Sequence, residues 1–275
     1  MAIIITELFF RNVNGIINNM LLNILRKWRK WHRAGQQMYN DPYLIKARKA
    51  HDEAVLLGEG RTDVINYILR KAGLNSYLEI GVRNPDDNFN LIRCENKISV
   101  DPGVEFGPNP VRYKMTSDDF FTKLRSGLLD IDKGTRFDLI FIDGLHLSYQ
   151  ADRDIANAIE YISDKGFIVV HDCNPPTEFH AREEFGFKNS PASHFWNGTT
   201  WKAFYKHRFN ENTTSVCIDM DWGLGVITKM DLFNRLTQNE NPFFEFHIFD
   251  RYRIRHLNLL TYDAFKVLLD GHYNL

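Results

Sequence analysis

The chain has little net charge, few cysteines and no long apolar run, and each shortage argues against a class of protein. Its 34 basic and 35 acidic side chains leave a formal net charge of −1, so no overall field favours nucleic acid as a partner. It lacks the run of about eighteen apolar residues that a transmembrane helix needs, and its first residues lack the positive charge typical of a signal peptide. The three cysteines are odd in number and far apart, which predicts free thiols in a reducing, cytoplasmic compartment rather than a disulfide framework or a zinc pair.

The 275 residues suffice for one elaborated α/β domain with an N-terminal addition. We predict a basic, amphipathic helical extension over residues 1–58 and a folded domain over residues 59–275. Within the extension, residues 12–33 place on one helical face the apolar residues Val13, Ile16, Ile17, Met20, Leu21, Ile24, Leu25, Trp28 and Trp31. The end of this helix carries the cations Arg26, Lys27, Arg29, Lys30 and Arg33.

Two interpretations of this extension remain open. Its apolar face docks on its own domain or on a second subunit of a homo-oligomer, or it makes peripheral contact with an anionic membrane through residues 12–33.

The central stretch, residues 137–174, has the pattern strand, loop, helix, strand. An apolar strand over 137–143 precedes a helix over 147–163, which Lys165-Gly166 is expected to end, and a second apolar strand over 167–170. Such a unit joins parallel strands through a right-handed crossover, so Asp143 and Asp172 should lie side by side at the carboxyl edge of the sheet. Alternatively, the first acid caps the helix and the second begins a turn.

Further elements complete the predicted sheet. Strands are expected over 77–82, 97–101 and 111–116, an antiparallel hairpin over 215–220 and 223–228, and helices over 60–72, from Phe120, over 200–208 and over 261–269. The irregular segment 174–200 has the length of a lid or substrate loop. The predicted fold is α/β: a Rossmann-like, doubly wound, seven-stranded and mostly parallel sheet with an antiparallel C-terminal edge hairpin.

The strand ends indicate which nucleoside cofactor this edge binds. Gly81 follows the first strand and Asp101 ends the second, but the full G-x-G-x-x-G pattern that serves a pyrophosphate is missing. S-adenosylmethionine carries no phosphate, and its ribose and positive sulfur suit carboxylates at strand ends. Arg83 is positioned to meet its carboxylate.

Five short segments resemble the class I S-adenosylmethionine-dependent methyltransferases, in particular the small-molecule O-methyltransferases that include catechol and macrolide-sugar enzymes. They are EIGV at 79–82, SVDP at 99–102, MTSDDFF at 115–121, FIDGLH at 141–146 and VVHDC at 169–173. The resemblance covers roughly residues 60–230. It implies that Glu79 and Gly81 line the methionine end of the cofactor, that Asp101 holds the ribose diol, and that Ser117 and Asp118 lie at the adenine.

The resemblance also implies a catalytic centre. Asp143, which borders the cofactor as well, and Asp172 match magnesium-ligand positions, and His146 matches the base of the sugar enzymes. Cys173 follows Asp172 where the relatives have an oxygen ligand, so Mg²⁺ dependence stays open, with Asn174 as a substitute donor. The expected reaction is in-line methyl transfer to a hydroxyl of a small molecule, sugar, glycan or glycolipid. His146 would take the proton, and a bound ion would lower the pKa of the hydroxyl.

Rival functions use the same residues differently. A metal-dependent hydrolase would use Asp143, His146, His171 and Asp172, and a non-catalytic domain would bind partners through the basic helix. A nicotinamide oxidoreductase ranks last because the glycine-rich turn is missing. Among the remaining candidates, His171 is expected to be structural or to support Asp143 or Asp172, Trp196 to stack on a sugar ring and Trp201 to lie in the core. His180 and His194 are expected to be surface loop residues.

Overall fold

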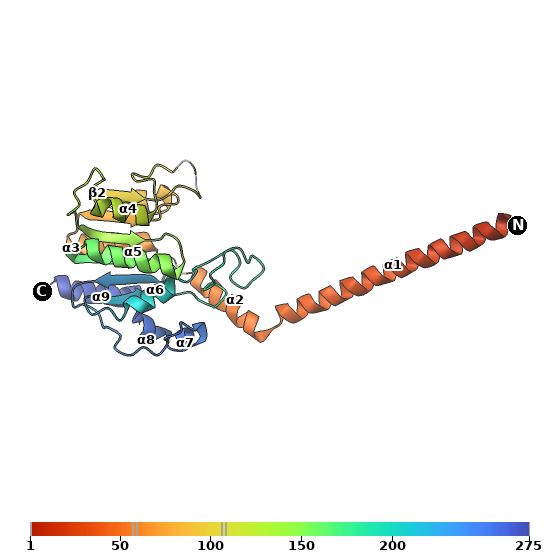
Figure 1. Ribbon diagram of the computed structural model, residues 1–275. Coiled ribbons are helices and arrows are strands. Elements are labelled where there is room, and N and C mark those ends of the chain that lie inside the picture. The colour runs from red at the N-terminus through yellow and green to blue at the C-terminus, as the bar shows by residue number, and fades with distance from the viewer. Residues whose placement is uncertain (1, 57, 59, 106, 108, 275) are drawn as a thin grey trace. The chain divides into compact units, whose positions relative to one another are not determined.

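The computed structural model describes residues 2–56, 58, 60–105, 107 and 109–274, with side chains from residue 20 onward inside the first helix. The chain divides into two compact units, one up to Lys49 and one from Ala50 onward, a boundary that precedes the sequence-based one at residue 58. The first unit contains α1 (Ala2–Tyr39), drawn in Figure 1 as one continuous helix, and the start of α2 (Pro42–Val55). Thus α1 extends beyond the predicted 12–33 at both ends. None of the described helices combines the length and hydrophobicity that a bilayer span requires.

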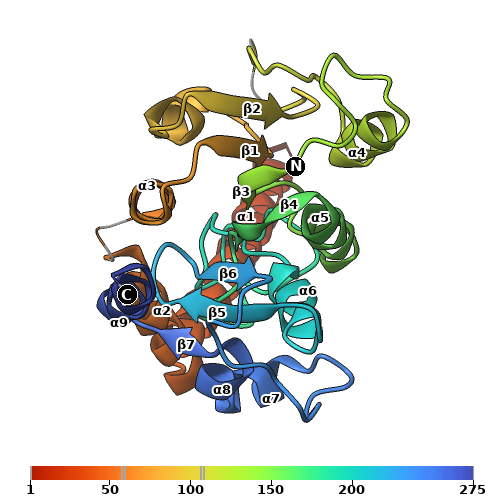
Figure 2. The ribbon, with the colours of Figure 1, turned by 90° about the vertical axis from the view of Figure 1, so that its left-hand side faces the viewer.

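The second unit is built on a seven-stranded sheet with the order β2-β1-β3-β4-β6-β5-β7, which Figure 2 shows nearly edge-on. Strands β1 to β4 pair in parallel, whereas β6 runs antiparallel to both β4 and β5. This confirms the predicted doubly wound, mostly parallel sheet with an antiparallel C-terminal hairpin. The strands are β1 (Ser76–Ile80), β2 (Asn96–Val100), β3 (Phe137–Ile142), β4 (Ile162–Val170), β5 (Thr214–Ile218), β6 (Leu224–Thr228) and β7 (Leu259–Leu260).

Helices cover both faces of this sheet, so its central strands are buried apolar runs. One face carries α4 (Ser117–Arg125), α5 (Ser148–Tyr161) and α6 (Thr200–His207), and the other carries α3 (Arg61–Ala72) and α9 (Tyr262–Tyr273). Two apolar cores result, one centred on residues such as Phe120, Ile155 and Phe204, the other on Val64, Ile68 and Phe265. The shorter helices are η1 (Pro85–Asp87), η2 (Phe89–Leu91), α7 (Phe246–Arg251) and α8 (Arg253–Leu257).

Local sequence explains the helix ends that border the site. Gly73 ends α3 in the left-handed conformation with φ 65°, as its position predicts. The side chain of Thr116 accepts a hydrogen bond from the N–H of Asp119 and so caps α4, which begins at Ser117 rather than near Phe120. All three cysteines are free, as expected from their spacing.

Two expectations about secondary structure are wrong. The segment 111–116 is not a strand, because it forms only a single bridge, between Val100 and Tyr113, before the chain turns into α4; β7 is the seventh strand instead. Lys165-Gly166 does not end a helix, because α5 stops at Tyr161 and β4 starts at Ile162. A Cβ on Gly166 would lie 2.8 Å from the backbone oxygen of Asp138, so this glycine serves close strand packing.

Candidate active site

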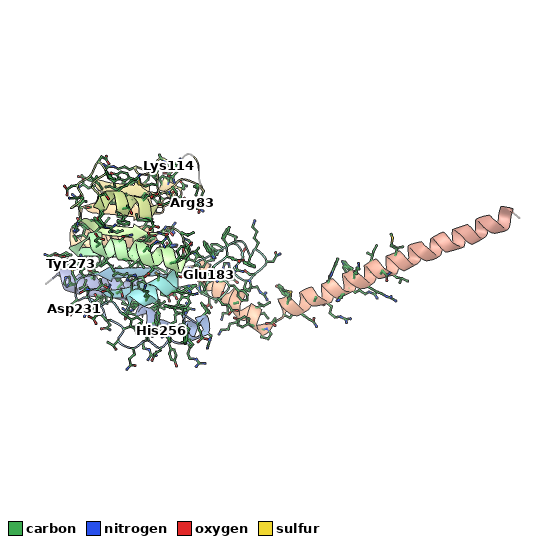
Figure 3. The ribbon with its side chains drawn as sticks, viewed as in Figure 1. Arg83, Lys114, Glu183, Asp231, His256 and Tyr273 are labelled. Carbon is green, nitrogen blue, oxygen red and sulfur yellow. The ribbon has the colours of Figure 1, made fainter. Side chains whose placement is uncertain are left out.

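The carboxyl ends of the parallel strands meet at one edge of the sheet. The N–H of Gly81 donates to Val100 O over 2.9 Å, that of Asp143 to Ile80 O over 2.9 Å, and that of His171 to Ile142 O over 3.0 Å. Each loop therefore continues the pairing of its strand, and Asp101, Gly81, Asp143 and Asp172 lie along one rim, as predicted. In Figure 3, Arg83 and Glu183 lie towards one end of the sheet, whereas Tyr273 and Asp231 lie towards the other.

Two histidines lie between the two acids of this rim. His146 Nε2 is 3.3 Å from Asp143 Oδ1, and its Nδ1 is 3.1 Å from Asp172 Oδ2. His171 Nδ1 is 3.2 Å from Asp143 Oδ1 and 3.1 Å from Asp172 Oδ2. The acids predicted at adjacent strand ends therefore share their partners, which helix capping alone does not explain, and His171 contacts both of them rather than one.

Arg61 and Asp221, which the sequence did not single out, complete this group, called the rim cluster below. Arg61 begins α3, and its Nη1 lies 3.6 Å from Asp143 Oδ2 and 3.1 Å from His171 Nε2. Asp221 follows β5, lies 3.2 Å from His171 Nε2 through Oδ1, and accepts the backbone N–H of Arg61 over 2.8 Å. The available signal for Asp221 was its place in Asp221-Trp222, the connection of the predicted hairpin; no local pattern marks Arg61.

The charges of the rim cluster shift the pKa values of its members. Burial alone would raise the pKa of Asp143, but His171, His146 and Arg61 hold it well below its usual range. Burial alone would lower the pKa of His146, but Asp172 and Asp143 raise it to about 9, and the same acids raise that of His171 well above its usual value. Against burial, His171 and Arg61 lower the pKa of Asp221 to about 2. At neutral pH the carboxylates of Asp143 and Asp221 therefore face two imidazolium ions and a guanidinium.

The backbone at this rim is strained. Asp172, Asp221 and Trp222 all have positive φ angles, of 62°, 43° and 63°. Such conformations cost roughly 1–3 kcal/mol each in residues other than glycine and concentrate at functional sites. Asp172 is held by Asn197, whose Nδ2 donates to its Oδ1 over 2.8 Å.

Three of these side chains have the geometry of a metal site. One ligand atom from each of Asp143, His146 and Asp172 lies within 4.8 Å of the others. Two carboxylates suit Mg²⁺, whereas an imidazole suits Zn²⁺ or Fe²⁺ better, so the residues fit a divalent cation without selecting Mg²⁺. The buried Cys173 lies with its Sγ 3.3 Å from Val170 O, and Asn174 Oδ1, considered above as a substitute donor, accepts a hydrogen bond from Arg253.

Next to the rim cluster lies a buried acid at the end of β1. Glu79 accepts hydrogen bonds from Tyr77 Oη and from Asn88 Nδ2, the latter over 3.0 Å. Burial raises its pKa to about 7, although the hydrogen bond from Tyr77 opposes the shift. Beyond it, Gly81 has φ 86°, and a Cβ there would lie 2.1 Å from the backbone oxygen of Asp143. Only glycine allows this close approach, which explains why the segment EIGV at 79–82 has glycine at position 81.

Asp101 directly follows β2 and is partly buried. Its Oδ1 accepts from the N–H of Gly103 over 2.5 Å and from Asn109 Nδ2 over 3.2 Å. Burial raises its pKa, and the Gly103 N–H opposes that rise. Asn109 Oδ1 is buried and has no hydrogen-bond partner among the described residues, so this loop has an unused acceptor beside Asp101.

The other predicted cofactor residues lie farther along the edge. Ser117 and Asp118 begin α4, and both accept hydrogen bonds from Gln150 Nε2 of α5. Arg83 is 67% exposed in its side chain and pairs with Asp87 over 3.2 Å rather than pointing into a cleft.

Aromatic side chains from segment 174–200 and the β5–β6 turn lie beside the rim cluster. The Trp196 ring stacks on His146 at 5.3 Å between centroids, and its Nε1 donates to Arg182 O. His180 is fully buried, contrary to its expected place on the surface, because it bonds Thr177 and packs against Trp222 at 5.6 Å. Trp201 is 1% exposed, which confirms its core position.

Comparison with known proteins identifies the domain that carries this edge. Residues 67–173 match the family model of a methyltransferase domain, from within α3 to the residue after Asp172. This stretch of the chain is similar to a methyltransferase domain. The match confirms the resemblance found in the short motifs, and it favours methyl transfer over the hydrolase, oxidoreductase and non-catalytic alternatives.

Solved structures similar to this methyltransferase include a putative O-methyltransferase from Klebsiella pneumoniae, 13% identical, with a TM-score of 0.42, covering 69% of this chain and 90% of that one. Another is an O-methyltransferase from Bacillus cereus in complex with SAH, 12% identical, with a TM-score of 0.41 and coverages of 68% and 90%. A third is TomG from Streptomyces achromogenes in complex with SAM, 13% identical, with a TM-score of 0.39 and coverages of 69% and 90%. None of the curated proteins compared matches the chain.

Proposed function

We propose that this methyltransferase transfers a methyl group from S-adenosylmethionine to a hydroxyl of a small molecule or sugar. The observation that carries the proposal is the single rim on which Gly81, Asp101, Asp143 and Asp172 meet, all within the matched residues 67–173. Neither the loop after β1 nor the loop after β2 contains the glycine-rich turn that a pyrophosphate needs, so a nucleoside without phosphate suits this edge better. The free cysteines favour a reducing, cytoplasmic location.

Each predicted cofactor residue has a task that its environment allows. S-adenosylmethionine supplies a methyl group on a positively charged sulfur. Glu79, with a pKa of about 7, gains from a nearby cation because a positive ligand favours its charged form. Asp101 offers a carboxylate for the ribose hydroxyls, and Ser117 and Asp118 offer polar atoms for the adenine. Arg83 would first have to leave Asp87 before it could meet the carboxylate of the cofactor.

His146 can either bind a metal ion or act as the base, but not both through the same nitrogen. Asp143 and Asp172 would hold a divalent cation, which would lower the pKa of an acceptor hydroxyl. Beside Asp143 and Asp172, the pKa of about 9 keeps His146 protonated at neutral pH, and a protonated imidazole cannot accept a proton. His146 can therefore act as the base only if bound cofactor, metal or acceptor weakens its contacts with Asp143 and Asp172 and so lowers its pKa.

The acceptor is best matched by a sugar hydroxyl, on a glycan or a glycolipid. Trp196 is half-buried and stacks on His146, while Phe185 meets its ring edge-on at 5.8 Å. An aromatic face beside the reacting group suits the apolar face of a sugar ring, which would also leave a hydroxyl directed at His146.

Calorimetric titration with S-adenosylmethionine and S-adenosylhomocysteine tests the cofactor assignment. We expect micromolar binding that is lost in Asp101→Asn and kept in Asp164→Asn, a matched change at a 99% exposed carboxylate. Absence of heat with either ligand in folded protein would overturn the assignment.

The variant His146→Gln separates the two roles of the histidine. If His146 is the base, titration with Mg²⁺ or Mn²⁺ keeps its affinity while methyl transfer falls about 10²-fold or more. If it is a ligand, the metal affinity itself falls. An enzyme that retains full activity in EDTA would exclude an essential ion.

A further inference from the structure

The described part of α1 exposes a set of large apolar side chains. Met20 is 60% exposed, Ile24 53%, Trp28 58% and Trp31 70%. Their spacing of four, four and three residues places them along one side of a helix with 3.6 residues per turn. Leu21 and Leu25, also about half exposed, extend the same side, which we call the apolar face of α1.

Cations occupy the opposite side of the same helix. At 100° per residue the exposed Arg26, Lys30 and Arg33 point away from the apolar face, and the exposed Lys27 and Arg29 lie at its two borders. Between Glu7 and Asp41 the sequence contains no acidic residue. The helix is therefore amphipathic, and every charged residue between 20 and 39 is positive, with two tryptophans close to these cations in the sequence.

These charges decide which occupant fits the apolar face. A second copy of α1 docked on this face would double the positive charge of the pair, with no acid between Glu7 and Asp41 of either helix to offset it. A bilayer with anionic headgroups supplies both an apolar interior and negative charge, and tryptophan favours the boundary between them. A positive polar side with no acid thus favours the bilayer over self-association.

We propose that α1 lies in the plane of an anionic membrane surface and anchors the methyltransferase there. The apolar face enters the headgroup–acyl boundary, and the cations contact the lipid phosphates and carboxylates. The stretch from Met20 to Tyr39 is about 30 Å long at 1.5 Å per residue, enough to keep both tryptophans at one depth when the helix lies flat. The inference does not depend on methyl transfer, but it would bring the enzyme to lipid-linked acceptors.

Flotation of the full chain with phosphatidylcholine vesicles, with and without phosphatidylserine, tests the proposal. Binding is expected to the anionic vesicles and to be much weaker with phosphatidylcholine alone. Arg29→Gln with Arg33→Gln should weaken binding roughly 25-fold, because each cation near an anionic surface contributes about fivefold. Trp28→Glu with Trp31→Glu should abolish it.

Matched controls change similar side chains elsewhere in the chain. Phe243→Glu replaces an apolar side chain that is 84% exposed, and Lys123→Gln with Lys133→Gln removes two exposed cations; none of these should alter flotation. Circular dichroism checks that each variant is folded. The arginine variants should keep the helix, because glutamine is also a good helix former.

Other outcomes overturn the proposal. Failure of the folded chain to float with anionic vesicles would do so, as would equal binding to neutral vesicles. If Trp28→Glu with Trp31→Glu instead converts a dimer to a monomer in sedimentation, and the wild type does not float, the apolar face is a self-association surface.

Discussion

Replacing Gly81 with alanine tests how tightly the loops of the cofactor edge are packed. The new Cβ would lie 2.1 Å from Asp143 O and 2.7 Å from Gly144 Cα, both backbone atoms that cannot rotate away. The φ of 86° adds conformational strain of about 1–2 kcal/mol for an L-residue, and forcing extra volume into a packed site adds about 1–3 kcal/mol. We therefore expect Gly81→Ala to lower the free energy of unfolding by about 2–5 kcal/mol.

Gly73→Ala provides the matched control for this substitution. Gly73 also has a positive φ, of 65°, but a Cβ there would meet nothing within 4 Å. It should therefore cost only the conformational term, about 1–2 kcal/mol. The difference between the two variants isolates the clash with the Asp143 loop.

Urea denaturation followed by near-ultraviolet circular dichroism measures both variants, and calorimetry measures their affinity for S-adenosylhomocysteine. Gly73→Ala should keep the affinity, whereas Gly81→Ala should lower it, because the displaced loop carries Asp143. The reasoning fails if Gly81→Ala costs no more stability than Gly73→Ala, since the close approach would then be absent in solution.

Three further predictions concern groups outside the rim cluster. Burial raises the pKa of Asp154 to about 6, above its unfolded value of 3.8, so the free energy that Asp154 contributes to folding falls as the pH rises between these values. In urea denaturation, Asp154→Asn should therefore be up to about 3 kcal/mol more stable than the wild type at pH 7.5 and equal to it near pH 3. Burial lowers the pKa of His180 to about 3, so the protein should lose up to about 1.4 kcal/mol of stability per pH unit below pH 6.5. The free energy of unfolding of His180→Gln should fall less steeply between pH 6.5 and 5, and equal slopes for the variant and the wild type would contradict the burial of His180. A thiol reagent should label Cys94 in the native protein and reach the buried Cys173 and Cys217 only after denaturation; native labelling persisting in Cys94→Ser would refute this.

The sequence was most informative where physical rules act over a few residues. The buried strands β1, β3 and β4 are short apolar runs, and parallel pairing brings their carboxyl ends together whatever the loops contain. Asp143 and Asp172 could therefore be placed side by side from sequence alone. The hairpin of β5 and β6 was equally predictable, because Asp221-Trp222 separates two apolar runs.

Prediction failed where tertiary packing overrode the local pattern. Gly166 looked like a helix end, but its missing side chain instead lets β4 approach Asp138 of β3. His180 looked like a loop residue at the surface, yet its ring is enclosed by His51, Thr177 and Trp222. The segment 111–116 has a strand-like composition, but only Tyr113 reaches β2 before α4 begins.

The protonation of the rim cluster follows from residues that no local pattern could assign to it. From the sequence, His146 had the pKa near 6.5 that suits a base at neutral pH. In the fold it lies against both Asp143 and Asp172, and its pKa rises to about 9 because each acid stabilises the imidazolium. Arg61 arrives from the start of α3 and Asp221 from the turn after β5, so the balance of charge is set by four separate segments. Sequence reasoning could therefore find the acids and the histidine, but the proton that the histidine carries is a property of the folded edge.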